Sequence, residues 1–297
     1  MCRIVSIVKS ELTVRFFGGC YVTPSEPYFR NKSFPTKNYC RCSFIFFLIS
    51  LPPNMLPSLL DCMHSHGMDI KNRTLDTLTT SPKKRASLCM YAAKAGELNL
   101  LKWARFSGYP WNERVCSFAA SAGQFEILQW VRDNGCPWDE CTPAYAAKGG
   151  HFEILKWAHD RGCPWDERTC AYAALRGNFE ILQWARDRGC PWDEHTCAYA
   201  AEGGHLEILK WARDNGCPWD ERTCAHAAKE GHLVILQWAR DQGCPWDSST
   251  TQSAAEGEHL DVLAWARSQG CTWSKYIHWT TQNPRILQWA RNNGYPH

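Results

Sequence analysis

The sequence predicts an all-α protein built as a helical-repeat solenoid, and three observations support this prediction. Tryptophan recurs at a constant interval in two columns, each unit holds two short helical patterns, and the second pattern ends before a turn that usually contains proline. A fixed period between about 20 and 50 residues is the signature of a solenoid, whose units bury their apolar faces on their neighbours. We therefore expect about seven to eight stacked units rather than one closed core.

The two tryptophan columns hold fourteen of the 16 Trp residues, and Trp recurs every 27 positions within each column. The second column runs eight residues behind the first. The columns are Trp103, Trp130, Trp157, Trp184, Trp211, Trp238 and Trp265, and Trp111, Trp138, Trp165, Trp192, Trp219, Trp246 and Trp273. Because two short helices bury little apolar area by themselves, each unit needs a large apolar side chain. We expect both columns to form buried ladders, one inside the helical layer and one under the connecting turn.

The stretch Asp220–Gly243, "DERTCAHAAKEGHLVILQWARDQG", represents one unit. Its first half is rich in alanine, and either Asp220 or Thr223 can cap a helix there by accepting a backbone N–H. Gly231 ends this helix as a C′ glycine, which tolerates a positive φ. The first helix is therefore short and small-sided, so that a neighbouring helix can approach it closely.

The second half of the unit has the spacing of an amphipathic helix. Its apolar face comprises Leu233, Ile235, Leu236, Trp238 and Ala239, and its solvent face comprises Gln237, Arg240 and Asp241. The helix must stop at Cys244-Pro245-Trp246, because proline lacks an N–H and disfavours helical geometry in the residue before it. The chain therefore turns once per unit.

The segment 1–85 does not repeat, and the charge also changes at its end. Residues 1–85 carry 12 Lys and Arg against 5 Asp and Glu, a net +7, whereas residues 86–297 carry 21 against 25, a net −4. We divide the chain into an unassigned leader (1–54), a short N-terminal cap or linker (55–85) and the repeat array (86–297). The leader is either disordered or a gene-model artefact, with translation starting at Met55. Its run "SFIFFLISL" is too short to cross a bilayer, so no membrane insertion is expected.

Cysteine usage points to a reducing compartment. The 17 cysteines are an odd number, which excludes a fully paired disulfide scaffold within one chain. Most recur with the period, where cysteine serves as a small buried apolar residue. We expect an intracellular protein, cytoplasmic or nuclear.

The amino-acid sequence of the units resembles that of the ankyrin repeat family. The run "TPAYAAKGGHFEILKWAHDRG" at Thr142–Gly162 is similar to that family's Thr-Pro, paired alanine, Gly-His and amphipathic second helix. The family's usual period is 33, so about six residues are missing where its β-hairpin finger would lie. The resemblance implies an ankyrin-like solenoid with shortened or absent fingers, similar to the expanded tryptophan-rich ankyrin arrays of large DNA viruses and some protists.

The resemblance also implies a role for a histidine column. His151, His205, His232 and His259 stand before the second helix of their units, and Glu97, Gln124 and Asn178 fill this position elsewhere. In the family this position ties neighbouring turns by hydrogen bonds. Replacement by Glu, Gln and Asn suits a polar cap better than a metal ligand.

No catalytic, cofactor or metal site is expected. The "HFE" and "HLE" phrases match the H-x-E of zinc deaminases, but the accompanying P-C-x-x-C is absent. Cysteine pairs such as Cys217 and Cys224 are seven residues apart, which is wider than a zinc knuckle requires. The protein is therefore predicted not to be an enzyme.

The candidate binding residues lie in two columns that vary while their surroundings repeat. In a stacked solenoid a column becomes a continuous line on the surface. The candidates are Arg114, Arg168, His195 and Arg222 near the start of the first helix, and Lys148, Glu202 and Lys229 near its end. These two columns are either the surface that a partner contacts or a solvent-exposed surface where substitutions are tolerated.

We expect a scaffold or adaptor that binds an unidentified protein partner. The alternative is a helical-repeat surface that binds single-stranded nucleic acid, one base per unit. The net charge of −4 over the array argues against nucleic acid. The oligomeric state stays open.

Overall fold

The computed structural model describes residues 82–295, with the backbone alone for 82–86. The chain divides after Ser87, and the repeats lie in the unit Leu88–His297. The expected leader and nearly all of the expected cap or linker therefore lie outside the described residues. Within the described part every regular element is a helix, so the prediction of an all-α repeat protein is confirmed. No described helix is long and apolar enough to cross a membrane.

Each unit contributes a first helix and a second helix, most of them nine residues long. The first helices are α4 (Pro82–Ala95), α6 (Glu113–Ser121), α8 (Cys141–Gly149), α10 (Glu167–Leu175), α12 (Glu194–Glu202), α14 (Glu221–Lys229), α16 (Ser248–Glu256) and α18 (Ile277–Thr280). The second helices are α5 (Leu98–Phe106), α7 (Phe125–Asp133), α9 (Phe152–Asp160), α11 (Phe179–Asp187), α13 (Leu206–Asp214), α15 (Leu233–Asp241), α17 (Leu260–Ser268) and α19 (Pro284–Asn292).

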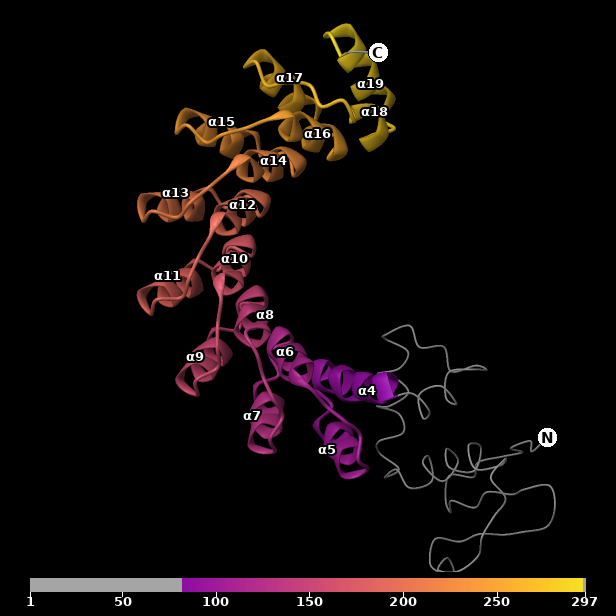
Figure 1. Ribbon diagram of the computed structural model, residues 1–297, viewed down its shortest axis with the longest axis vertical. Helices are drawn as coiled ribbons and strands as arrows, with labels where there is room; N and C mark the ends of the chain where they lie inside the picture. The colour runs from indigo at the N-terminus through magenta and orange to yellow at the C-terminus, as the bar shows by residue number, and fades with distance from the viewer. Residues whose placement is uncertain (1–81, 296–297) are drawn as a thin grey trace, which may run out of the picture. The chain divides into compact units, whose positions relative to one another are not determined.

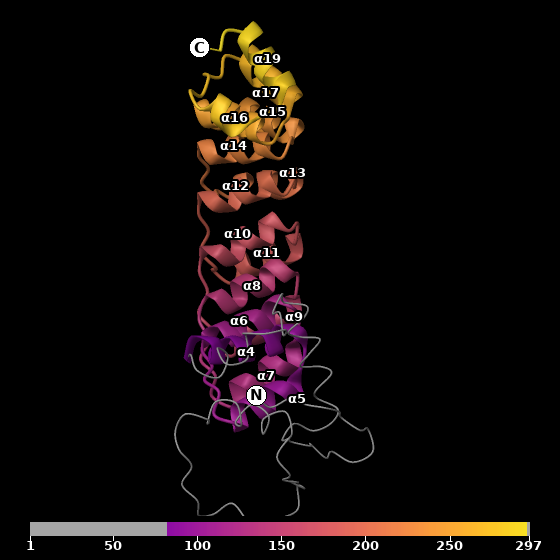
Figure 2. The same cartoon turned by 90° about the vertical axis from the view of Figure 1, so that its right-hand side faces the viewer.

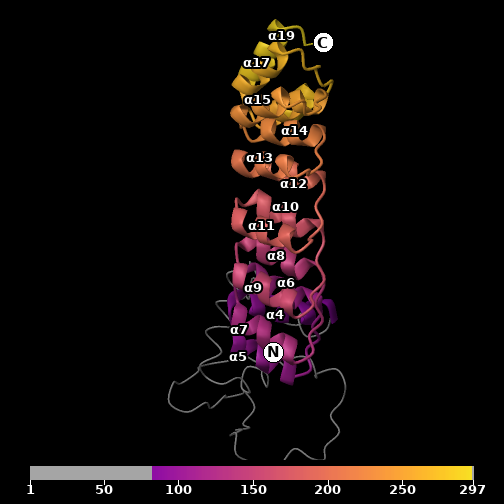
Figure 3. The ribbon, with the colours of Figure 1, turned by 90° about the vertical axis from the view of Figure 1, so that its left-hand side faces the viewer.

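The helices form two layers within the repeat unit Leu88–His297. The even-numbered helices from α6 to α16 stand in one layer and the odd-numbered helices from α5 to α17 in the other (Figure 1). Consecutive first helices from α6 to α18 pack directly on one another, and each of those from α6 to α16 also packs on its own second helix. The segments from each second helix to the next first helix run along one edge of the stack (Figures 2 and 3). They contain no strand, which agrees with the expected loss of the fingers.

An aspartate starts the first helix in four consecutive units. Its side chain accepts a hydrogen bond of 2.8–3.1 Å from the backbone N–H two residues later. These N-caps are Asp166, Asp193, Asp220 and Asp247. Of the two expected caps in the representative unit, Asp220 is therefore correct. Thr223 is fully buried, and its hydroxyl has no hydrogen-bond partner among the described residues. As expected, Gly231 follows that helix with a φ of +76°.

The core is made of small and aliphatic side chains. One leucine of every second helix from α5 to α17 is fully buried, and alanine and cysteine of the first helices close over it. The leucines are Leu101, Leu128, Leu155, Leu182, Leu209, Leu236 and Leu263. Because Ala and Cys are small, the first helices come close enough to bury these leucines completely.

The tryptophans are not in this core, and the expectation that both columns are buried is wrong. Every Trp of the two columns is half-buried. The second-column Trp of one unit meets the first-column Trp of the next edge to face, with ring centroids 5.7–6.0 Å apart. The eighth unit continues the series, since Trp289 meets Trp273 at 6.1 Å. The tryptophans do form a ladder, but along the surface of the second-helix layer.

An arginine closes the outer side of this ladder. In six units the arginine of the second helix stacks on the following second-column Trp, with its guanidinium carbon 3.9–4.6 Å from the ring centroid. Arg240, for example, covers Trp246 and donates to the carbonyl of Cys244. It was expected to face solvent, and that expectation is wrong. The Cys-Pro-Trp turn is thus held by a cation–π contact and by a charge-assisted hydrogen bond.

The turn cysteines tie the end of each unit to its beginning. Each thiol donates a hydrogen bond of 3.2–3.4 Å to the backbone carbonyl at the start of the first helix that precedes it in the chain. The cysteines are Cys136, Cys163, Cys190, Cys217, Cys244 and Cys271, and all are buried. They are packing residues, as expected, and each adds a second hydrogen bond to a carbonyl that already accepts a backbone N–H at the start of its helix.

The histidine column ties units together as the resemblance implied. His232 donates from Nε2 to the carbonyl of Glu202 at 3.1 Å, and His151 donates in the same way to the carbonyl of Ser121 at 3.3 Å. Asn178 replaces histidine in this column and donates to the carbonyl of Ala147 at 2.8 Å. None of these side chains caps its own helix, so the polar-cap interpretation is wrong.

We predict that the cost of losing an aromatic side chain follows its place in the ladder. Trp184 contacts Phe152 and Trp165, whereas Trp279 lies outside the ladder with 75% of its surface exposed. Trp184→Ala should lower the free energy of unfolding by about 1–3 kcal/mol. Each lost aromatic contact costs about 0.5–1.5 kcal/mol, and the loss of apolar burial adds to this only in part because the side chain is half-buried. Trp279→Ala should cost less than about 0.5 kcal/mol. Urea unfolding measures both, and equal shifts would contradict the ladder.

We also predict that alkaline pH destabilises the array through its thiols. Burial raises the pKa of Cys89 and Cys271 from 9.0 to about 11 and that of Cys163 to about 12. The folded chain therefore holds these protons when the unfolded chain has released them. The stabilisation is fully present below pH 9 and is lost as the pH rises towards 11–12.

The urea midpoint should therefore fall as the pH rises from about 9 to about 11. Tyrosine and lysine also begin to titrate in this range, so Cys271→Ala is the matched control and should show a smaller fall than the parent. A midpoint that does not change over this range would contradict the thiol contribution.

Candidate partner-binding face on the first helices

The candidate residues lie on one surface because of their spacing along each first helix. Residues 195, 199 and 202 of α12 are separated by four and then three positions, so their side chains share one helical face. The N-cap fixes where that helix begins and therefore which residues lie on this face. Stacking the first helices turns the three positions into three parallel columns, which we call the first-helix face.

The central column is an aromatic ladder that the sequence analysis missed. Tyr145 and Tyr172 stack with ring centroids 6.0 Å apart, Tyr172 and Tyr199 at 6.1 Å, and Tyr199 and His226 at 6.0 Å. All four rings are half-buried. Burial first, and then the neighbouring tyrosines, raise the pKa of Tyr172. The recurrence of an aromatic residue once per unit could have revealed this column.

The N-terminal column contains arginines that bridge units. Arg168 donates from Nε to Asp166 at 2.7 Å, from Nη2 to Glu140 at 3.2 Å and from Nη1 to the Cys141 sulfur at 3.5 Å. Burial opposes the charge, but the Asp166 hydrogen bond outweighs it and raises the pKa of Arg168. A planar guanidinium suits this three-point arrangement.

Arg222 repeats the same arrangement two units later. It donates to Asp220 at 2.7 Å and to Glu194 at 2.8 Å, and its Nη1 lies 2.7 Å from Nε2 of His195. A hydrogen bond from its own backbone N–H and the Arg222 contact lower the pKa of the largely exposed Glu194. The structure thus brings His195 and Arg222 together, whereas Arg168 bonds to Glu140 and Cys141 of the preceding unit and, among the described residues, forms no hydrogen bond with His195 or Arg222.

Arginine occupies this column only in alternate units. Arg114, Arg168 and Arg222 each lie two units from the next, and the positions between and after them hold Cys141, His195 and Ser249. Arg114 is exposed, with its guanidinium carbon 5.8 Å from the Phe118 ring centroid and no ion pair among the described residues. The arginine bridges therefore alternate with intervals that have none.

The C-terminal column is partly paired. Lys229 lies 2.9 Å from Glu256, and Oε2 of Glu202 lies 2.8 Å from Nδ1 of His226. Lys148 is exposed, and its ammonium is 4.9 Å from the Tyr172 ring centroid. Within residues 87–295 it makes no ion pair, so it presents free charge beside the aromatic ladder.

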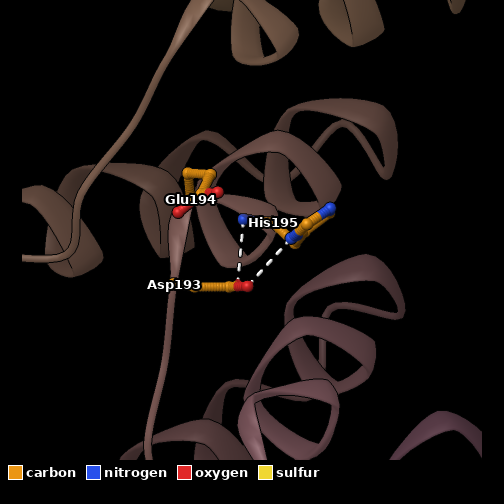
Figure 4. A group of neighbouring side chains, drawn as sticks. All are labelled: Asp193, Glu194 and His195. Carbon is orange, nitrogen blue, oxygen red and sulfur yellow. Dashed lines mark hydrogen bonds and ion pairs between the residues drawn. The ribbon is translucent and has the colours of Figure 1, made fainter.

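Asp193, Glu194 and His195 form the one described group of metal-ligand type, with their ligand atoms within 4.8 Å of one another. Figure 4 shows Asp193 accepting from the backbone and from Nδ1 of His195, at 3.0 and 2.9 Å. Arg222 contacts the other two members of the group, Oε1 of Glu194 and Nε2 of His195. A cation would have to displace that guanidinium, so the contacts describe an ion-pair network.

Two comparisons with known proteins found similarities to ankyrin repeats. Residues 144–186 match the family model described as ankyrin repeats (many copies). Among solved structures, the human ASB11 ankyrin repeat domain is similar at 14% identity and a TM-score of 0.44, over 61% of this chain and 98% of that one. A search of curated protein sequences found no match. The matched segment runs from α8 to α11, and the same pair of helices recurs on either side of it. Residues 144–186 are thus similar to ankyrin repeats, although the 27-residue unit of this chain is shorter than the family's usual one.

Proposed function

We propose that the array is a non-catalytic scaffold or adaptor that binds a protein partner along the first-helix face. Ankyrin repeats are generally protein–protein interaction modules. The observation that supports this surface is the stacked ladder of Tyr145, Tyr172, Tyr199 and His226, whose half-buried rings run across four units. Half-buried aromatic side chains are the usual anchors of protein interfaces.

The charged columns beside the ladder would give the surface its selectivity. Arg114 and Lys148 present free positive charge at its N-terminal end, whereas Arg168, Arg222 and Lys229 are paired with carboxylates. Glu202 adds a carboxylate beside His226. Charges at the rim of an interface choose partners and set register more than they add affinity.

The pairing of these arginines disfavours nucleic acid as the ligand. Phosphate binding needs a stripe of available cations. On this face most of the cations already contact Asp or Glu, and the array carries a net −4.

We also propose that the protein is intracellular, because all twelve described cysteines are free thiols, the form that a reducing compartment maintains.

A triple substitution tests this function. Arg168→Ser, His195→Ser and Arg222→Ser together should reduce capture of a protein partner by the full chain about tenfold or more, as loss of central interface residues does. Stability should change little, because exposed ion pairs contribute about 1 kcal/mol or less each. Affinity capture followed by a binding titration with the captured partner gives the measurement.

The matched control changes three residues of the second helices, Lys156→Ser, Gln183→Ser and Lys210→Ser, and should retain the partner. A partner that binds the first triple variant as tightly as the parent would exclude the first-helix face. A ligand identified as nucleic acid, with affinity that falls steeply as salt rises, would favour the alternative function.

A further inference from the structure

A pocket opens on the first-helix face between α10 and α12. Its volume is about 290 Å³, and it is lined by Glu167, Arg168 and Tyr172 on one side and by Asp193, His195 and Tyr199 on the other. It coincides with one of the intervals in which the N-terminal column lacks an arginine. The pocket exists because this interval between first helices differs from its neighbours, the α8–α10 and α12–α14 intervals.

In both neighbouring intervals an arginine of the chain fills the equivalent space. Arg168 reaches back to Glu140 between α8 and α10, and Arg222 reaches back to Glu194 between α12 and α14. Each guanidinium thus joins its own N-cap aspartate to the glutamate at the start of the preceding first helix. The repeat therefore has a built-in guanidinium position between consecutive first helices.

Between α10 and α12 that position is vacant. His195 stands where the arginine would be, and it contacts its own cap Asp193 at 2.9 Å instead of reaching back. Glu167 is the counterpart of Glu140 and Glu194, and it makes no ion pair among the described residues. The carboxylate that should receive a guanidinium is present, but the chain supplies none.

The charge around the pocket suits a cation. Glu167 and Asp193 line it, and Arg168 is held by Asp166 and Glu140. The lining residues Glu167, Asp193 and Arg168 together carry two negative charges and one positive charge, a net −1, and the positive charge is already paired outside the lining. Tyr172 and Tyr199 also line the pocket, with ring centroids 6.1 Å apart, and offer aromatic contact to a cation.

We propose that this pocket binds the guanidinium of an arginine side chain supplied by a protein partner. This proposal rests on the proposed function, because it names what the partner inserts into the first-helix face. Glu167 would receive the guanidinium through a charge-assisted pair, Asp193 would accept a further hydrogen bond, and the two tyrosines would line the pocket beside it. Arginine fits better than lysine, because a planar fork can reach two carboxylates at once.

The test titrates the full chain with Nα-acetyl-arginine methylamide and follows the backbone NMR signals of α10 and α12. The comparison probes are the citrulline derivative, which has the shape without the charge, and the lysine derivative, which has the charge without the fork. We expect saturable shifts at Tyr172 and Tyr199 with the arginine probe, weaker binding of the lysine probe and none of the citrulline probe. No saturable shift with arginine, or equal affinity for citrulline, would overturn the proposal.

Two substitutions at one position separate filling of the pocket from loss of the histidine. His195→Arg gives the interval the chain's own guanidinium, as in Arg168 and Arg222, so it should fold and abolish probe binding. His195→Ser leaves the pocket open and should keep probe binding within about threefold of the parent. Retained binding in His195→Arg, or its loss in both variants, would contradict the vacant guanidinium position.

Two glutamate variants complete the experiment. Glu167→Gln should weaken probe binding about tenfold, which corresponds to loss of one hydrogen bond to a charged group. Glu221→Gln is the matched control, because Glu221 has the same helical position in α14 and lies outside the pocket. Equal weakening by both would overturn the assignment to Glu167.

The titration needs no partner, so the two proposals fail separately. If the probe does not bind but the triple serine variant still loses its partner, the pocket assignment alone is wrong. If the probe binds and the triple variant keeps its partner, the proposed function is wrong.

Discussion

The structure depends on the fact that none of its short helices is stable by itself. A helix of nine residues is marginal in water, since the cost of nucleation is repaid only over a longer stretch or by packing. Every unit is therefore stabilised by packing on its neighbours. The fully buried leucine of each second helix from α5 to α17 and the histidine or asparagine before the second helix both contribute to this coupling. Because each of these contacts involves adjacent units alone, the array can be regarded as a chain of nearest-neighbour interactions.

The two aromatic ladders have different roles because their surroundings differ. The tryptophans of the second-helix layer have partners on most sides, since other rings meet their edges and, in six units, an arginine covers the turn Trp. The tyrosines of the first helices stack along their own column, with the ammonium of Lys148 over Tyr172 and the ring of His195 at the edge of Tyr199. Among the described residues no arginine stacks on these tyrosine rings as it does on the turn tryptophans, so the second ladder is less covered by the chain than the first. This difference is why we assign packing to one and recognition to the other.

Periodicity predicted most of the fold, because a two-helix unit with a glycine and a proline at fixed places has few alternative conformations. It failed where the outcome depends on distances across units. The tryptophan columns were expected to be buried, but the alanines and cysteines bring the first helices so close that the core holds leucine, isoleucine and valine and no tryptophan. The same limit applied to the site. The columns containing Arg168 and Arg222 could be found by their variation, but the guanidinium bridges to Glu140 and Glu194 became visible only once the first helices of consecutive units were placed side by side.

The alternation of arginine along the N-terminal column has a consequence for how such an array can grow. Arg168 and Arg222 lie two units apart, so the pattern of bridged and unbridged intervals repeats with every second unit and not with every unit. Duplication of a single unit would place two intervals of the same kind next to each other, whereas duplication of a pair would keep the order. The block that can be copied without changing the surface is therefore a pair of units. Its recognition positions would recur at twice the separation of packed helices, about 20 Å.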